Sequence, residues 1–447
     1  MATTIAEPTT SEARAETQPT SLPPGPPLPM LVQTGVFWAA PDAFLSACRR
    51  LYGPTFTIRS LESSGPMVYV TREEDIKAVF TGDPDVFRAG EANGVYLAPV
   101  MGERSVLILD GDEHLEQRRR MLPPFHGESV KRYRDVVARI TEEELERWPL
   151  DTPFSVHPHT TAIALEVILR AVIGVDRGER ADAVRTVLRK LVDISIPQMM
   201  MWVWPQLGRF GPWRRYKRVL ETTDELLYDE IRSRRSDPAL SERHDVLSLL
   251  IREHGDAMSD KDLRDQLVTL LLAGHETTAT GLAWAFERLS RNPRVLRRLE
   301  QAIAQDDDDY LDAVVKETLR ARPVIFDVVR KVTRPADVAG HRVPAGAVVL
   351  PAIMLVQRDS QHFADPDSFR PERFLEGEGG TYTWFPFGGG RRRCLGAAFA
   401  TVEMKTVLRT VLSARELGTT SAPAERSRMK HITHVPARGA RIALRPR

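Results

Sequence analysis

The chain has 447 residues, of which 42% are hydrophobic and 28% are charged, and its formal net charge is +1. This composition is typical of a globular protein with a sizeable core, and it gives no general attraction to nucleic acid or to anionic membranes. With only two cysteines, Cys48 and Cys394, a disulfide framework is excluded and a reducing compartment is expected, although one bridge between the two stays open. The surroundings of Cys394 lack the clustered ligands of a zinc site.

Residues 1–21 are polar and contain neither the basic segment nor the apolar run of a signal peptide. We expect them to form a disordered tail. No apolar stretch of roughly 18 residues follows, so no membrane span is predicted and the expected location is the cytoplasm. Residues 22–29 (LPPGPPLP) predict a stiff, polyproline-like entry rather than a helix.

The rest of the chain, residues 22–447, predicts one large, mostly α-helical domain with a minor β part. Residues 41–52 have helical periodicity, whereas residues 56–59 and 67–71 are β-like runs separated by a turn signal (SSG). From Glu73 onward helical patterns dominate, interrupted by Pro and Gly. Because no repeat or linker divides the chain, we predict one domain, although the length alone would allow about three.

Residues 111–125 (GDEHLEQRRRMLPPF) predict a helix that ends near Pro123. His114 and Arg118 are four residues apart and therefore share one face of this helix. The pair belongs either to a solvated basic face or to a set of donors for an acidic group. The helix alone does not decide between the two.

Residues 196–204 (IPQMMMWVW) are unusually apolar for a segment between two helices. Methionine and tryptophan make an adaptable apolar surface, which suits either ordinary core packing or a flexible lid over a substrate entrance. The basic residues 213–218 predict a solvated helix face. With a net charge of +1, nucleic-acid binding is not expected.

Residues 259–290 predict a long helix that Ser259 caps and Pro293 ends. Such a helix is about 45 Å long, enough to cross a whole domain. Its flanks are apolar, but its centre contains Glu276 and Thr277. A buried carboxylate is costly unless it is paired or hydrated, and a threonine can bond back to a carbonyl and open the helix for water. The pair therefore indicates either a proton relay or a solvated stripe.

Two further segments carry one acid and two arginines. Glu317 and Arg320 (in ETLR) lie three residues apart on a predicted helix, which by itself indicates only a weak surface ion pair. Arg373 (in PERF) lies in a loop rich in Pro and Asp. One carboxylate shared by two arginines would form a planar network that satisfies a buried charge.

Near the C-terminus, residues 387–396 read FGGGRRRCLG. Arg391, Arg392 and Arg393 precede Cys394, and positive neighbours favour a thiolate over a thiol. The glycines allow the backbone to approach a bulky flat partner closely. A thiolate on such a loop suits a metal ligand. The alternative is a glycine-rich turn that happens to contain a cysteine.

Taken together, AGHETT, ETLR, PERF and FGGGRRRCLG resemble the motifs of the cytochrome P-450 haem-thiolate monooxygenases of the soluble bacterial type. All four occur in the family's order and spacing, and the resemblance covers nearly the whole chain from about Leu22. It implies the cytochrome P-450 fold, with haem b between the long helix and the cysteine loop. It also implies insertion of one oxygen atom from O2 into a lipophilic small molecule such as a terpene or a fatty acid, by hydroxylation or epoxidation.

The resemblance assigns roles by position. Cys394 matches the axial iron ligand, and Glu276 and Thr277 match the acid–alcohol pair that delivers protons to oxygen. The residues that match a structural triad are Glu317, Arg320 and Arg373. The other residues implied to contact the haem are His114, Arg118, Arg330, Phe387, Arg392 and Gly396.

Family position also suggests a substrate pocket built from an early loop, the long helix, the stretch after ETLR, the C-terminal end and the apolar segment 196–204. Its implied lining residues are Val95, Tyr96, Leu97, Met199, Trp202, Ala273, Ile325, Phe326, Val328, His434 and Val435.

The implied electron source is NAD(P)H, through a ferredoxin or flavodoxin and a reductase, because no electron-transfer domain is recognised in the chain. The basic residues Arg119, Arg120 and Arg391 would suit an acidic ferredoxin, and a monomer is expected. Two other functions stay open, a haem-thiolate peroxygenase or isomerase and a non-catalytic haem-binding sensor. The intact Glu276–Thr277 pair favours oxygen activation over both.

Overall fold

The computed structural model describes most of the chain, and the ranges it describes are 20–175, 179–192, 206, 209–430 and 432–447. The predicted apolar lid, with Met199 and Trp202, and nearly all of the predicted tail lie outside these residues. Residues 22–29 contain no helix or strand, as predicted. No described helix has the length and apolar character needed to cross a bilayer.

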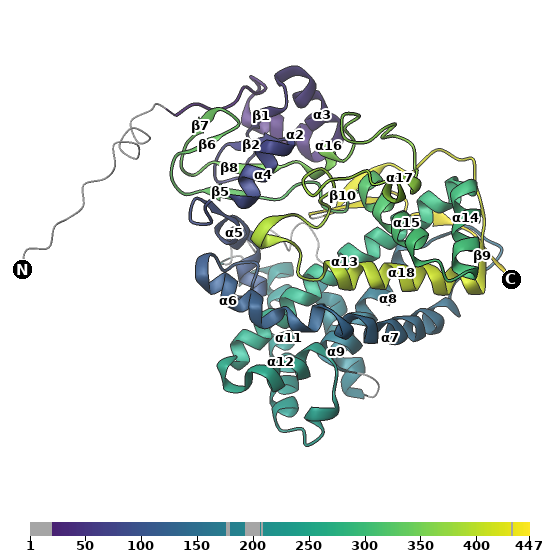
Figure 1. Ribbon diagram of the computed structural model, residues 1–447. Helices are drawn as coiled ribbons and strands as arrows, with labels where there is room; N and C mark the ends of the chain where they lie inside the picture. The colour runs from purple at the N-terminus through teal and green to yellow at the C-terminus, as the bar shows by residue number, and fades with distance from the viewer. Residues whose placement is uncertain (1–19, 176–178, 193–205, 207–208, 431) are drawn as a thin grey trace, which may run out of the picture.

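Helices dominate the described residues (Figure 1). They are α2 (Met30–Ala39), α3 (Pro41–Tyr52), α4 (Glu73–Thr81), α5 (Ala89–Met101), α6 (Gly111–Met121), α7 (Glu128–Leu145), α8 (His157–Val167), α9 (Glu179–Val192), α11 (Gly211–Arg235), α12 (Val246–His254), α13 (Asp260–Arg291), α14 (Pro293–Ala304), α15 (Asp308–Ala321), α16 (Ile353–Val356), α17 (Glu372–Leu375) and α18 (Ala397–Ala414). The prediction of a mostly α-helical chain with a minor β part is confirmed.

The strands are short. They are β1 (Thr55–Ile58), β2 (Met67–Val70), β3 (Phe87–Arg88), β4 (Phe154–Ser155), β5 (Arg330–Val332), β6 (Ala336–Val338), β7 (His341–Val343), β8 (Val348–Pro351), β9 (Arg415–Leu417), β10 (Ser427–Lys430), β11 (Thr433–Pro436), β12 (Arg441–Ile442) and β13 (Leu444–Pro446).

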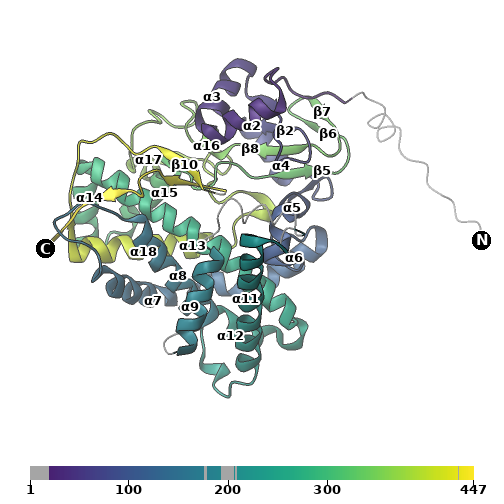
Figure 2. The same ribbon diagram turned by 180° about the vertical axis from the view of Figure 1, so that it is seen from behind.

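Five strands form the main sheet, in the order β1-β2-β8-β5-β3. The two strands predicted from the sequence are β1 and β2, which pair antiparallel with Phe56 opposite Tyr69. β8 adds to β2 in parallel, with Leu350 opposite Tyr69. This sheet and helices α2 to α4 lie on one side of the molecule, at the top of Figure 1, and the larger helical part lies below (Figures 1 and 2).

The helical part is organised around α13, the long helix predicted from residues 259–290. The Ser259 side chain accepts a hydrogen bond from the Asp262 backbone, and Asp262 bonds back, so a capping box starts the helix where the sequence placed its cap. Pro293 follows it as the first residue of α14. Helices α8, α11 and α18 pack against α13, so α13 lies at the centre of the helical core.

The predicted helix over residues 111–125 is present but shorter. α6 ends at Met121, and a single 3-10 turn over Pro123–Phe125 follows. The two prolines lack the N–H groups that would continue the helix, so the chain tightens instead. His114 and Arg118 both lie on α6, and His114 is buried.

Candidate active site

The middle of α13 contains accessible residues in an otherwise buried helix. Most side chains of this helix are buried, and Trp284 is fully enclosed. Ala273 is exposed and Thr277, one turn further on, is partly exposed. α13 runs through the middle of the helical part (Figure 1). Accessible surface therefore lies beside Glu276, the acid of the predicted acid–alcohol pair.

Glu276 is a buried carboxylate with a cationic partner. Lys430 of β10 donates to both of its oxygens, over 3.0 and 3.1 Å. The Nε2 atoms of His157 and His275 each lie 3.8 Å from one of the oxygens. Burial alone would raise the pKa of Glu276, but Lys430 and His157 outweigh it and hold this pKa below its usual range. The cost of burying this acid is thus offset by pairing.

Thr277 makes the bond to a carbonyl that the sequence suggested. Its hydroxyl donates to the carbonyl of Ala273 over 2.7 Å. α13 runs as one helix from Asp260 to Arg291, and the local opening for water stays a prediction. A threonine bond to the carbonyl four residues earlier fits within regular helix geometry.

The cysteine loop is shaped by protein contacts as well as by its glycines. The Cys394 N–H donates to the carbonyl of Phe387 over 2.8 Å and closes the loop. Gly390 has φ +62°, and a Cβ there would lie 2.2 Å from the carbonyl oxygen of Phe80 on α4. This glycine is therefore required by the close approach of α4. At Gly396 a Cβ would meet no atom within 4 Å, so this glycine, unlike the three glycines at 388–390, borders open space.

Cys394 is exposed. Surrounding protein nevertheless raises the pKa of its thiol by burial, while the Gly396 N–H and the charges of Arg118 and Arg393 oppose the rise. The expectation that the neighbouring arginines favour the thiolate holds in direction only, because burial outweighs them without a metal. Arg392 is not among these cations, since it turns toward Asp110 instead. The exposed cysteine is thus accessible to a metal ion.

Four basic side chains, termed the cation cluster, converge beside this loop: His114, Arg118, Arg330 and Arg392. Burial and the charges of the three arginines lower the pKa of His114 to about 3. Burial, followed by the charge of Arg392, lowers the pKa of Arg330 to about 10. Arg392 pairs with Asp110 and donates to the Val106 carbonyl over 3.1 Å. Among the described residues, no carboxylate pairs with Arg118 or Arg330.

The cation cluster and the thiol fit a haem. Three arginines and one aspartate, Asp110, leave two uncompensated positive charges, and His114 is neutral at its lowered pKa. Haem b carries two propionate carboxylates, which would compensate both charges. Cys394 offers a soft sulfur ligand for iron on a loop with open space at Gly396. The donor set therefore matches the group that the sequence implied.

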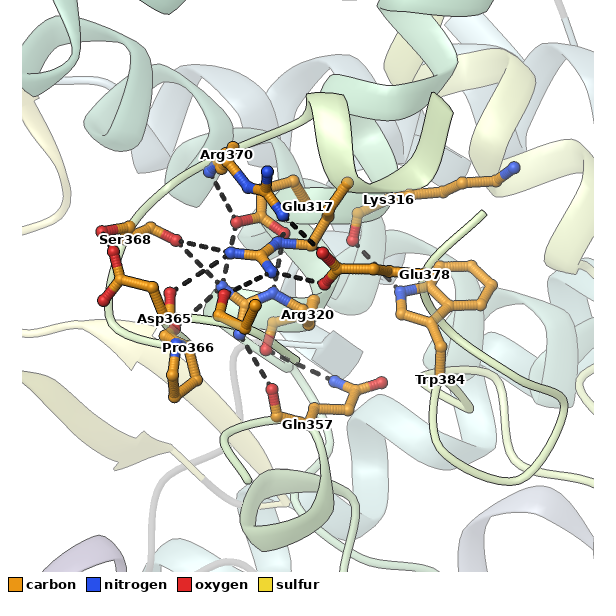
Figure 3. A network of polar contacts seen from close by, with 12 residues as sticks. Lys316, Glu317, Arg320, Gln357, Asp365, Pro366, Ser368, Arg370, Glu378 and Trp384 are labelled. Carbon is orange, nitrogen blue, oxygen red and sulfur yellow. Dashed lines mark hydrogen bonds and ion pairs between the residues drawn. The ribbon is translucent and has the colours of Figure 1, made fainter. Parts of the chain in front are cut away.

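The three residues of the predicted triad meet in the interior, and each side chain is 0% exposed. Figure 3 shows Glu317 and Arg320 in this group. Arg320 donates to both oxygens of Glu317, over 2.7 and 2.9 Å. The Nε atom of Arg373, which comes from α17, lies 3.2 Å from the same carboxylate. Arg373 also donates to Glu378 over 2.7 Å. Two guanidinium groups thus face two carboxylates, so the charges balance without a ligand.

Backbone carbonyls complete this arrangement, termed the triad network (Glu317, Arg320, Arg373 and Glu378). Arg320 donates to the carbonyls of Gln357 and Pro366, each over 2.9 Å. The Arg370 N–H donates to Glu317 over 2.7 Å. The network therefore joins α15 to the loops on both sides of α17 (Figure 3).

The described pocket residues fall into three groups. Val95, Tyr96 and Leu97 lie on α5, a helix where a loop was expected. Ala273 lies on α13. The rest lie in the stretch after α15 and on β11, and they are Ile325, Phe326, Val328, His434 and Val435.

Their exposure differs. Ile325, Phe326 and Val328 are partly exposed, and Phe326 stacks on His434 with the ring centroids 4.9 Å apart. His434 and Val435 are 4% and 1% exposed, so protein packing covers both side chains.

Sequence reasoning missed two residues that shape this site. Lys430 pairs with Glu276 from 154 positions away, and no local signal marks it. Asp110 has a signal, since it directly precedes the first residue of α6, but its partner Arg392 is 282 positions away. Asp327 lies within the predicted pocket stretch 325–328, and it bonds to a tyrosine of the main sheet.

The sequence profile of the family described as Cytochrome P450 matches residues 19–436 of this chain. The chain belongs to the cytochrome P450 family. Cytochrome P450 135B1 of Mycobacterium tuberculosis is 47% identical over 433 residues, which are 95% of this chain and 91% of that protein. Cytochrome P450 135A1 of the same organism is 39% identical over 438 residues, with 97% of each chain covered.

Solved structures share the fold. A retinoic-acid-bound cyanobacterial protein, CYP120A1, superposes with a TM-score of 0.83 at 21% identity, covering 96% of this chain and 100% of that one. The haem domain of cytochrome P450DA superposes with a TM-score of 0.81, also at 21% identity, covering 96% and 99%. The predicted cytochrome P-450 fold is confirmed.

Family membership establishes the class of reaction. The protein is a haem-thiolate monooxygenase that uses haem b, O2 and electrons derived from NAD(P)H through partner proteins, and its substrates are lipophilic. The predicted enzyme class and cofactors are confirmed. The roles assigned to individual residues stay predictions.

Proposed function

We propose that this enzyme hydroxylates or epoxidises a lipophilic small molecule, such as a terpene or a fatty acid, and that a ferredoxin or flavodoxin with its reductase supplies the electrons. The observation that carries the proposal is the presence of two accessible sites in one molecule. They are the exposed Cys394 and the partly exposed Thr277, which follows the buried acid Glu276. A thiolate ligand combined with a polar pair on the central helix supports oxygen activation.

The haem, when bound, supplies the activation of O2 and the transfer of one oxygen atom. In this proposal Cys394 ligates the iron, and the cation cluster holds the propionates. Phe387, whose carbonyl accepts the Cys394 N–H, fixes the loop beside the sulfur, and Gly396 leaves room for the macrocycle. The triad network holds the loops around α17 without taking part in the chemistry.

Protons reach the pocket through Glu276 and Thr277 in this proposal. The pairing with Lys430 holds the pKa of Glu276 low, so this side chain is ionised and its oxygens can accept hydrogen bonds from water. The Lys430 side chain is 31% exposed, and His157, at 3.8 Å, is 13% exposed. Both link the buried acid toward solvent. Thr277 is partly exposed, and its hydroxyl would pass the proton onward.

The partner surface is proposed from exposed arginines near the cysteine loop. Arg391 and Arg393 are exposed, and Arg119 is exposed on α6. A basic surface of this kind suits an acidic electron carrier, and mutating it would slow association more than the chemistry. We further propose that the protein acts as a monomer in the cytoplasm.

The ligand assignment is tested by the reduced, CO-bound protein. Wild type is expected to show the red-shifted Soret band of thiolate ligation, and Cys394→Ala is expected to lose it. A band retained by Cys394→Ala, or missing from wild type, would contradict the assignment.

The proton route is tested by the share of NAD(P)H consumption that appears as product. Thr277→Val and Glu276→Gln are expected to lower product formation about 100-fold or more, because positioned acid–base groups contribute that much. Thr278→Val is the matched control, since Thr278 is the next residue of α13 but is buried. Full turnover by the two variants, or turnover of wild type with peroxide alone and no need for redox partners, would favour a peroxygenase.

A further inference from the structure

One carboxyl group in the predicted pocket has half of its hydrogen-bonding capacity unused. The hydroxyl of Tyr69 donates to Oδ2 of Asp327 over 2.9 Å. Tyr69 is 0% exposed and stacks on Phe56 with the ring centroids 5.4 Å apart, so its hydroxyl is fixed in place. No hydrogen bond or ion pair within the described part of the chain involves Oδ1. Asp327 is therefore anchored on one side and open on the other.

The residue before Asp327 is connected to the candidate active site through the β10–β11 hairpin. Lys430, which holds Glu276, lies on the same β10–β11 hairpin as His434. His434 stacks on Phe326, the residue before Asp327.

The residue after Asp327 lies close to the cysteine loop. The side chain of Val328 lies 3.6 Å from the Cβ position of Gly388, in the cysteine loop. The two residues that flank Asp327 thus contact the β10–β11 hairpin and the cysteine loop.

Asp327 is partly exposed, so part of the residue is accessible. Burial and the charge of Glu62 raise the pKa of this carboxyl to about 7, and the hydrogen bond from Tyr69 opposes the rise. No described cation forms an ion pair with Asp327. A cation bound at Oδ1 would therefore favour the ionised carboxylate.

We propose that Asp327 sets substrate specificity by binding a protonated amine on an otherwise apolar substrate. The ammonium N–H would donate to Oδ1 while Tyr69 holds Oδ2, which is a charge-assisted hydrogen bond in a site removed from water. This inference rests on the proposed function and narrows its substrate class. A fatty-acid carboxylate would be repelled at this position by Asp327 and Glu62.

The test uses three ligands with the same chain: N,N-dimethyldodecylamine, dodecan-1-ol and dodecanoate. Their affinities for the haem-loaded enzyme are measured from the spin-state shift of the haem, which reports binding without turnover. Wild type is expected to bind the amine about 10-fold or more tightly than the alcohol, and dodecanoate most weakly, because hydrogen bonds between charged groups are stronger than those to a neutral hydroxyl.

Asp327→Asn keeps the shape and still accepts the Tyr69 bond through its amide oxygen. In this variant the affinity for the amine is expected to fall about 10-fold or more, the affinity for the alcohol to stay within about 2-fold, and the affinity for dodecanoate to rise. Asp337→Asn is the matched control, since Asp337 lies on the β6–β7 hairpin with its side chain 71% exposed. The control is expected to match wild type for all three ligands.

Two results would overturn the inference. One is a wild type that does not bind the amine or binds it no better than the alcohol. The other is an Asp327→Asn variant in which all three affinities change together with a lower melting temperature, which would assign Asp327 a structural role. The CO band of thiolate ligation is recorded for each variant. If wild type lacked that band, the proposed function would fail first, and the two failures are thereby distinguished.

Discussion

The triad network and the cation cluster both bury arginines, and they balance the charges differently. In the triad network, Arg320 and Arg373 face Glu317 and Glu378, and carbonyls take the remaining donors. In the cation cluster only one of the three arginines, Arg392, pairs with a carboxylate, that of Asp110. An unpaired buried charge is costly, so a protein keeps one only where something else compensates it. The comparison shows one region completed by the chain itself and one left for an anionic ligand.

The largest expected effect comes from breaking the completed region. Glu317→Ala would leave the buried Arg320 and Arg373 without the carboxylate that they share. Removing one partner of a buried ion pair costs about 3–5 kcal/mol, a large part of the total stability of roughly 5–15 kcal/mol. We therefore expect a much lower free energy of unfolding and little folded holoenzyme. Denaturant unfolding measures this free energy. A loss below about 1 kcal/mol would show that the network is dispensable.

The open region should respond in the opposite way. Arg330→Leu removes a buried cation that has no carboxylate partner among the described residues, so the unfolding free energy of the apoprotein is expected to stay equal or to rise. The haem is expected to dissociate about 10-fold or more faster, because a charge-assisted bond to a propionate is lost. Transfer of haem to an excess of an acceptor apoprotein measures this rate. Arg334→Leu is the control, since Arg334 is 68% exposed.

The pH dependence of stability should reveal the buried His114 of the cation cluster. Burial and the three arginines lower the pKa of His114 to about 3 in the folded protein, against about 6.5 when unfolded. Between these values the unfolded state binds more protons, so stability falls as the pH falls below 6.5, by about 1.4 kcal/mol per pH unit.

His114→Gln is expected to remove this slope from the apoprotein. Bound propionates would raise the pKa of His114, so the slope should be smaller in the wild-type holoenzyme than in the apoprotein. Unfolding free energies at pH 7, 6 and 5 measure both effects. Identical slopes in wild type and variant would count against a buried, neutral His114.

The smallest effect is expected at the edge of the triad network. The Arg370 side chain is 39% exposed and pairs with Glu376 and Glu378, while its backbone N–H bonds to Glu317. Arg370→Ala keeps the backbone bond and loses only partly exposed pairs, which are worth about 0–1 kcal/mol. The same denaturant unfolding experiment measures it. A cost near that of Glu317→Ala would mean that the network extends to the surface.

The sequence alone determined those features that depend on neighbouring residues. The helix predicted over residues 41–52 has the same bounds as α3, and Ser259 caps α13 as predicted. Helical periodicity, a cap and a following proline act within a few positions, so they can be read without the fold. The four motifs likewise identified the family, because each is a short local pattern in a set order.

The tertiary structure decided which distant groups meet. Lys430 and Glu276 are 154 positions apart, Arg392 and Asp110 are 282 apart, and Tyr69 reaches Asp327 across 258. No local pattern encodes such pairs, because each depends on how helices and sheet pack against one another. The same packing decided which buried charges are paired within the protein. It closed the triad network within the chain and left the cation cluster with two positive charges that a ligand must balance.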